Sequence, residues 1–190
     1  MRPRLARRRH VTAVVVALVL GAASAGPIAQ SATAPDVKAA FLYNFAKFTE
    51  WPSDALSASA PLSLCVIDDA KLVRALEEAT AGRDVEGHTL VVRKIAFDGP
   101  VRSCHLVYAS GLDAKRSTRL IEMLNGAPVL AVSDLESFAS AGGAINFFLE
   151  DGRMRFAVNL EATQRARLRL SSKLLSLAKI VKDDSHVAQH

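Results

Sequence analysis

The chain has 190 residues, half of them hydrophobic, with 24 basic and 19 acidic side chains. Five arginines lie within the first nine residues, which leaves 19 basic and 19 acidic side chains in the rest of the chain. Because the rest of the chain is formally neutral, its charge gives no support for binding to nucleic acid or to an anionic membrane surface.

The first 25 residues have the layout of a secretory signal peptide. The arginines precede an apolar run from Val11 to Leu20, and Ala23-Ser24-Ala25 forms a small-residue cleavage pattern. We predict cleavage after Ala25, with a cut after Ala34 as the alternative. An uncleaved membrane anchor is disfavoured, because about 10 to 14 apolar residues do not span about 30 Å of hydrocarbon. We therefore expect the protein in the periplasm, with no direct membrane insertion.

The mature chain is long enough for one domain, which we place at residues 36–182, before a polar tail at residues 183–190. Its two cysteines, Cys65 and Cys104, would reach an oxidising compartment, where paired thiols persist as a disulfide. Two buried free thiols are the alternative. Two cysteines fit no zinc-site spacing, and we expect no metal.

Hydrophobic spacing predicts strands alternating with helices over most of this domain. Asp36 is a suitable N-cap for a helix through Phe48, which Trp51-Pro52 ends. The apolar face of this helix is expected to hold Val37, Ala40, Phe41, Phe45 and Phe48. Further strands are expected at residues 62–67, 89–95, 104–109 and 128–132, and further helices at residues 70–79 after Asp69, at 113–124, and at 134–139 after the capping-box pattern of Ser133 and Glu136.

The segment from Gly143 to Asn159 predicts an antiparallel hairpin with its turn at Asp151-Gly152. In that register one face carries the apolar pairs Ile145–Val158, Phe147–Phe156 and Leu149–Met154. The other face carries Asn146–Ala157, Phe148–Arg155 and Glu150–Arg153. The whole pattern indicates an α/β fold: a sandwich with a mixed, mostly parallel sheet, a C-terminal antiparallel hairpin and flanking helices.

Two helices are expected after the hairpin. Asn159 caps the first, from Leu160 to about Arg167, and Ser171 or Ser172 caps the last, which runs to Val181. The core stripe of the last helix is expected to hold Leu174, Leu177, Ala178 and Val181. Because Leu175 and Ile180 widen its apolar arc beyond the roughly 100° that packing needs, this face could bind a partner. The alternative is that neighbouring elements cover it.

Motifs for catalysis are missing from the sequence. It contains neither the nucleophile elbow G-x-S-x-G nor the phosphate loop G-x-x-x-x-G-K-[ST], so we expect no enzyme, no catalytic residue and no cofactor. Asp68-Asp69 after a strand fits a helix cap better than a magnesium site. His186 and His190 lie in the polar tail and are interpreted as a frayed end.

Basic residues gather in the last third of the sequence. Most such side chains are solvated surface, but arginine matches carboxylate and phosphate groups in a bidentate way. The second interpretation predicts a site for an acidic ligand at Arg153, Arg155, Arg169 and Lys173.

Three separate blocks of the sequence resemble one known family. They are Val37–Pro52 (VKAAFLYNFAKFTEWP), Gly142–Phe156 (GGAINFFLEDGRMRF), and Asn159-Leu160 followed by Ser171–Val181 (SSKLLSLAKIV). In order and spacing they resemble the YfiR family of periplasmic proteins. Cys65 and Cys104 match the long-range disulfide pair of that family, whereas its second, closely spaced cysteine pair is absent here.

The resemblance implies a periplasmic repressor that binds the periplasmic domain of a YfiN-like inner-membrane diguanylate cyclase and lowers cyclic di-GMP signalling and biofilm formation. It also implies a homodimer and sequestration by a YfiB-like lipoprotein. The implied partner-binding residues are Phe156 and Val158 of the hairpin with Leu174, Leu175 and Ile180 of the last helix. A periplasmic small-ligand receptor that acts on another membrane sensor, such as a histidine kinase, is the alternative function.

Overall fold

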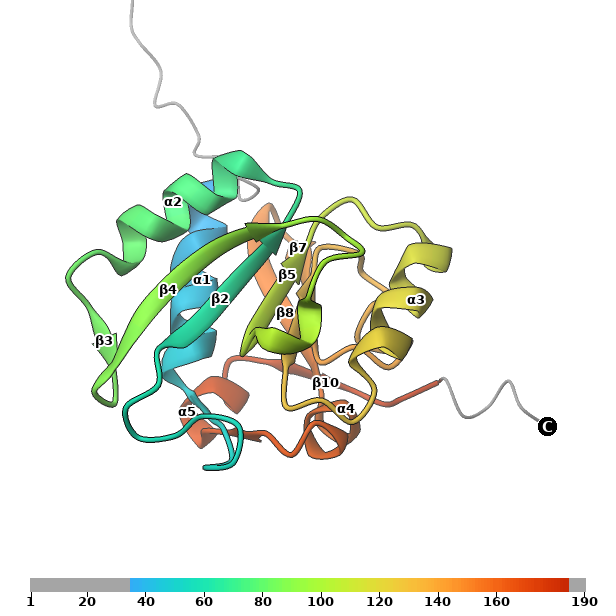
Figure 1. The fold of residues 1–190 in the computed structure, drawn as a ribbon. Helices are drawn as coiled ribbons and strands as arrows, with labels where there is room; N and C mark the ends of the chain where they lie inside the picture. Colours follow the sequence, from blue (N-terminus) through green and yellow to red (C-terminus); the bar gives the residue numbers. More distant parts are fainter. Residues whose placement is uncertain (1–34, 185–190) are drawn as a thin grey trace, which may run out of the picture.

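The computed structural model describes residues 35–184. The predicted signal peptide, both cleavage sites and residues 185–190 of the predicted tail lie outside the described residues. Figure 1 shows the elements in chain order: α1 (Pro35–Lys47), β1 (Thr49–Glu50), β2 (Leu62–Ile67), α2 (Ala70–Thr80), β3 (Asp84–Val85), β4 (His88–Ile95), the 3-10 helix η1 (Val101–Ser103), β5 (Leu106–Ala109), α3 (Ala114–Leu124), β6 (Leu130–Ser133), β7 (Ile145–Glu150), β8 (Arg153–Asn159), α4 (Leu160–Arg165), β9 (Arg169–Leu170), α5 (Ser172–Leu175) and β10 (Lys179–Val181).

The main sheet has eight strands in the order β10-β8-β7-β6-β5-β2-β4-β3. Only the hairpin pair β7–β8 and the short pair β3–β4 are antiparallel, and the other neighbours are parallel. A separate antiparallel pair, β1–β9, joins the segment after α1 to the segment after α4. The predicted α/β fold with a mixed, mostly parallel sheet is therefore confirmed.

Two hydrophobic cores lie on opposite faces of the main sheet. The larger core packs α1 and α2 against alternate residues of β2, β5, β6, β7 and β8, and it also includes Leu174 of α5. The smaller core packs α3 against the other alternate residues, among them Cys65, Val107 and Ala131. Because β2 is covered on both faces, all six residues of 62–67 are buried and the segment does not alternate between buried and exposed positions. Figure 1 shows α1 and α3 on either side of the sheet.

Polar caps begin α2, α3 and α4 where the sequence places them. Asp69 accepts hydrogen bonds from the amides of Lys71 and Leu72, at 3.1 and 3.0 Å, and begins α2. Asp113 begins α3, and Asn159 begins α4 by accepting from Ala162 N at 2.9 Å. These caps satisfy amides that have no partner within the helix.

The hairpin has the predicted register at all six pairs, from Ile145–Val158 to Glu150–Arg153. Asp151 and Gly152 have φ of 49° and 70°, the left-handed conformation that a two-residue turn of this twist requires. The sequence pattern was sufficient to predict this register, because the paired residues and the turn between them are close together in the sequence.

The first helix differs in its start and in its buried face. It begins at Pro35, a favourable first helical residue, so Asp36 lies in the first turn rather than at the cap. Its buried residues are Ala39, Leu42, Phe45 and Ala46, and Ala40 is exposed. Because this helix has apolar residues on more than one of its sides, their spacing alone could not decide which side faces the sheet.

The helix predicted at residues 134–139 is wrong. This segment forms turns, and Ser133 Oγ accepts from Leu135 N at 3.2 Å instead of forming a capping box with Glu136. The physical reason is that the Asp134 carboxylate binds groups from other parts of the fold, which fixes the chain direction here.

The last helix is also much shorter than predicted. Ser171 Oγ accepts from Leu174 N at 3.3 Å and caps α5, but α5 ends at Leu175 after four residues. The chain then turns and forms β10, in which Ile180 pairs with Val158 of β8. Pairing with the free edge of β8 satisfies main-chain groups over a stretch with the β-branched pair Ile180-Val181, and it overrides the helical spacing.

The described chain ends in an anchored segment. Asp183 is buried and its carboxylate lies 2.6 Å from Arg165 Nη2 of α4, while Asp184 N donates to Ser140 O at 2.8 Å. The first two residues of the predicted tail are thus part of the folded domain. Among residues 35–184, no helix is long and apolar enough to cross a membrane.

Candidate partner-binding surface

Three of the five predicted partner-binding residues are buried. Phe156 and Val158 belong to the larger core, where the Phe156 ring lies 5.0 Å from the Phe45 ring and 5.9 Å from the Phe41 ring. Leu174 is buried in the same core. Phe156 and Val158 lie on the sheet face that α1 covers, and Leu174 of α5 packs into the same core. In this conformation they offer no surface to a partner.

Of the other two predicted residues, Ile180 lies in the edge strand β10 and Leu175 is the last residue of α5. Ile180 of β10 is 49% exposed, Leu177 of the preceding turn is 68% exposed, and Leu175 is half-buried. Lys173, Lys179 and Lys182, which are close to them in the sequence, are also exposed. We call these six residues the β10 surface. It combines two of the largest exposed apolar side chains among the described residues with an open strand edge.

The predicted acidic-ligand residues fall into two groups. Arg153 and Arg155 lie near the start of β8, and Arg155 Nε is 3.5 Å from Glu150 of the hairpin. Arg169 lies on β9, with Nε 3.6 Å from Glu50, and Lys173 follows on α5. Most of β8 and all of α4 separate the groups along the chain. Binding of an acidic ligand by either group stays a prediction.

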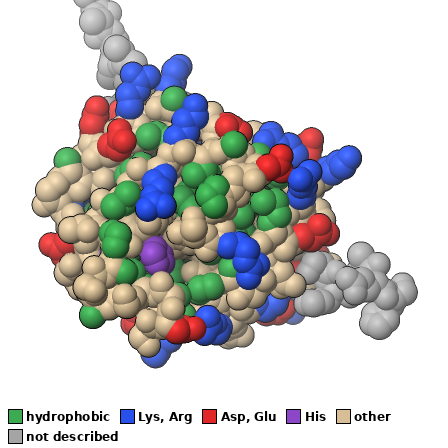
Figure 2. Space-filling view, viewed as in Figure 1, with side chains coloured by type: hydrophobic (Ala, Val, Ile, Leu, Met, Phe, Trp, Pro, Cys, Tyr) green, Lys and Arg blue, Asp and Glu red, His purple; other side chains and the backbone are tan. Residues whose placement is uncertain are grey.

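Charge elsewhere on the surface is mixed. Basic and acidic side chains are interspersed over the face shown in Figure 2, without an extended region of one sign. This distribution fits the neutral composition of the body of the chain. Within residues 35–184, no three histidine, cysteine or acidic side chains gather as metal ligands would.

Sequence patterns missed a polar cluster centred on Asp134. Its Oδ2 accepts from Lys38 Nζ at 2.9 Å and from Tyr108 OH at 3.1 Å, and its Oδ1 accepts from Gly111 N at 3.0 Å. Burial, reinforced by Asp134, raises the pKa of the Tyr108 hydroxyl well above its ordinary value, so this group stays a donor. No local pattern could reveal it, because the partners lie 96, 26 and 23 residues away from Asp134.

A pocket of about 230 Å³ adjoins this cluster. The main-chain pairing of β6 with β7 ends at Ser133–Asn146, whereas β7 continues to Glu150, so β7 extends beyond its neighbour. The pocket is lined by Lys38, Asp134, Glu136, Phe147, Phe148, Leu149 and Met154. Apolar walls with a few charged groups are typical of small-molecule sites, although this volume is small for one.

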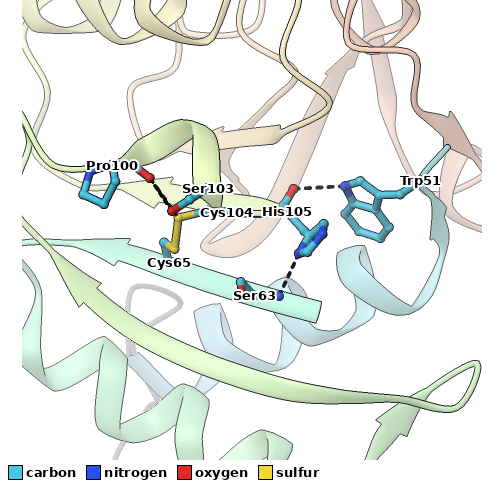
Figure 3. Close-up of a disulfide and its surroundings, with 7 residues drawn as sticks. All are labelled: Trp51, Ser63, Cys65, Pro100, Ser103, Cys104 and His105. Carbon is cyan, nitrogen blue, oxygen red and sulfur yellow. Dashed lines mark hydrogen bonds between the residues drawn. A yellow bond between two sulfur atoms is a disulfide. The ribbon is translucent and has the colours of Figure 1, made fainter. Parts of the chain in front are cut away.

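Cys65 and Cys104 form a disulfide, as predicted (Figure 3). Cys65 lies in β2, and Cys104 lies two residues before β5, so the bond joins two neighbouring strands at the middle of the sheet. Both cysteines are buried in the smaller core. His105 follows the disulfide directly. Its ring Nδ1 accepts a hydrogen bond from the Ser63 amide, and its main-chain carbonyl accepts one from the indole N–H of Trp51.

A model of the YfiR/HmsC-like family matches residues 35–179, which covers most of the chain. The chain belongs to the YfiR/HmsC-like family. The predicted resemblance is thus confirmed, and membership places the chain in a regulatory, non-catalytic family. Together with the disulfide, it indicates a periplasmic protein.

Two solved structures resemble this YfiR/HmsC-like chain weakly. A conserved domain protein of Vibrio cholerae shares 14% identity with a TM-score of 0.48, over 69% of this chain and 57% of that one. An ABC domain in complex with L-Trp from Streptococcus pneumonia shares 8% identity with a TM-score of 0.44, over 63% of this chain and 55% of that one. The chain thus spans little more than half the length of either protein.

Proposed function

We propose that this protein represses a YfiN-like inner-membrane diguanylate cyclase by binding its periplasmic domain, and so lowers cyclic di-GMP signalling. Membership of the YfiR/HmsC-like family is the observation that carries the proposal. The buried disulfide supports it, because the bond persists in the oxidising compartment where such a domain is found.

The proposed contact is the β10 surface. Exposed Leu177 and Ile180 supply apolar area, and strand β10 supplies an edge at which a partner can add main-chain hydrogen bonds. The surrounding Lys173, Lys179 and Lys182 favour a partner whose rim is acidic. The proposal also includes a homodimer and sequestration by a YfiB-like lipoprotein. Either of these contacts would use exposed apolar surface and would therefore compete with the cyclase for it.

Deletion of the gene tests the proposed function. Loss of a repressor should raise cellular cyclic di-GMP and biofilm formation, and expression of the wild-type chain should reverse both. Cyclic di-GMP is measured in extracts by mass spectrometry. An unchanged level in the deletion strain would contradict repression of a cyclase.

A small-ligand receptor acting on another membrane sensor is the second candidate, and the pocket beside Asp134 is the observation that favours it. Nucleotides and amino acids at about 100 times their dissociation constant should stabilise such a receptor by about 2.7 kcal/mol. A thermal-shift screen of the purified protein measures this. A shift with one ligand, combined with unchanged cyclic di-GMP on deletion, would favour the receptor over the repressor.

A further inference from the structure

The main chain of His105 is held between three parts of the fold. Its N–H donates to Ser63 O at 2.9 Å, and its carbonyl accepts from Leu130 N at 2.8 Å and from Trp51 Nε1 at 3.1 Å. His105 directly follows Cys104, whose disulfide joins it to β2. The backbone at this position therefore cannot shift without breaking bonds to β2 and to β6. Figure 3 shows His105 between Ser63 and Trp51.

The ring of His105 has only one protonation state that fits its neighbours. Nδ1 accepts from the Ser63 amide at 2.9 Å, and Nε2 lies 3.2 Å from Ala55 O. An amide N–H can only donate and a carbonyl oxygen can only accept. The ring is therefore neutral, with its proton on Nε2. A second proton on Nδ1 would face the Ser63 N–H, so that two donors oppose each other.

The bond from His105 Nε2 holds Ala55, near the middle of residues 51–61, the segment that connects β1 to β2. His88 of β4 holds this segment close to its end, because its Nδ1 lies 2.8 Å from Ala60 O and must donate to it. This second contact tolerates a charged ring, since protonation of Nε2 leaves the Nδ1 donor in place. The two histidines thus differ: protonation breaks the contacts of His105 and preserves that of His88.

We propose that His105 is a pH-sensitive switch: protonation of its Nδ1 expels the ring from the Ser63–Ala55 site and releases the part of the connecting segment around Ala55, while His88 still holds Ala60. Release would open the cavity of about 280 Å³ that Trp51, Leu56, Leu62 and His88 help to line. The switch is a property of the fold and does not depend on the identity of any partner.

The surroundings of His105 oppose its protonation. Burial lowers the pKa of the ring, the bond to Ala55 opposes this effect in part, and the charges of His88 and Arg93 on β4 lower the pKa further. The neighbouring β2 contributes only the uncharged Ser63 amide. Asp54, the acidic residue of the 51–61 segment, is paired with Arg167 at 2.8 Å.

The sign of the pH effect follows from linkage. A released ring titrates near the ordinary value of 6.5, and the docked ring titrates below it. The closed state is therefore fully stable above that value and loses stability as the pH falls through it toward the pKa of the docked ring. One proton taken up on release raises the opening equilibrium by up to about tenfold per pH unit within this window.

Amide hydrogen exchange of the oxidised protein, followed by NMR between pH 7.5 and 5, tests the switch. The protection factor of the Ser63 amide should be constant above about pH 6.5 and should then fall by up to about tenfold per unit. Amides of β6, such as Val132, should keep their protection, which distinguishes local release from global unfolding.

His105→Gln is the matched variant, because a glutamine amide can accept from Ser63 and donate to Ala55 but does not titrate. It should make Ser63 protection independent of pH, whereas His88→Gln should keep the wild-type fall. A pH-independent wild type, or His105→Gln with the wild-type fall, would overturn the proposal. The ring nitrogen shifts of the wild type provide a readout that needs no variant: they should show an unprotonated Nδ1 and a pKa for His105 below the ordinary value of 6.5.

Discussion

Asp134 connects three parts of the chain that are distant in sequence. Its two oxygens accept from Lys38 of α1, Tyr108 of β5 and the Gly111 amide that follows β5. Lys38 is only 12% exposed, so its ammonium group has little water to replace this carboxylate. A partly buried cation that loses its partner costs far more than an exposed one.

Substitution Asp134→Asn should therefore lower the free energy of unfolding by about 2 kcal/mol, since it removes a charged acceptor from three donors. Asp98→Asn is the control: Asp98 lies 2.8 Å from Arg119, but both side chains are mostly exposed, and its loss should cost at most about 0.5–1 kcal/mol. Urea unfolding of both variants measures the difference. Equal losses would show that Asp134 is not a stabilising centre.

Single residues whose role is local could be predicted from the sequence, and those with distant partners could not. Asp69 and Asn159 act on amides within three residues of themselves, so their position before a helix is sufficient evidence. Asp134 and His105 act on groups that are 23 to 96 residues away. Their roles depend on which strands become neighbours, and no spacing in the sequence encodes that.

At the scale of elements, the disulfide is the covalent link between β2 and β5. It closes a loop of 39 residues. In the chain-entropy model, a loop of this size adds about 3–4 kcal/mol to the stability of the oxidised form. That is a large part of the roughly 5–15 kcal/mol expected for a whole domain.

Substitution Cys65→Ser should lower the melting temperature of the oxidised protein and leave the reduced protein nearly unchanged. The expected loss in the oxidised form is about 3–4 kcal/mol. Calorimetry with and without a reducing agent makes the comparison, with the reduced wild type as the control for packing. If both forms lose equal stability, the residue matters for packing alone and the bond contributes nothing.

Three neighbouring strands at one end of the sheet, β7, β8 and β10, show which elements can be predicted and which cannot. The β7–β8 hairpin was predictable to the residue because its turn and its alternation lie within 15 consecutive residues. Strand β10 could not be predicted, because Leu174, Leu177 and Val181 also fit the spacing of a helix. Only the free edge of β8, which exists in the folded sheet alone, selects the strand conformation of β10.

At the scale of the whole molecule, residues 35–184 form a main sheet with two covered faces and with exposed apolar side chains at its β10 edge. Helices α1 and α2 cover one face and α3 covers the other, so most apolar side chains in the described chain are buried. The predicted contact residues Phe156, Val158 and Leu174 are part of that covered area. The contact that we propose for a partner lies at β10, where Leu177 and Ile180 are exposed beside an edge strand.

Ile180 and Leu149 allow a matched test of that proposed surface. Ile180 is 49% exposed at β10, and Leu149 is 52% exposed near the turn of the hairpin, outside the β10 surface. Substitution by aspartate removes a similar exposed apolar area at either position and adds the same negative charge. If β10 is the contact, only Ile180→Asp removes a central apolar group, which should weaken binding by about 2 kcal/mol or about 30-fold.

The most direct measurement is cellular cyclic di-GMP in the deletion strain that expresses the wild type, Ile180→Asp or Leu149→Asp at equal periplasmic levels. The account predicts low cyclic di-GMP with the wild type and with Leu149→Asp, and high cyclic di-GMP with Ile180→Asp. Full repression by Ile180→Asp, or equal loss of repression in both variants, would contradict it.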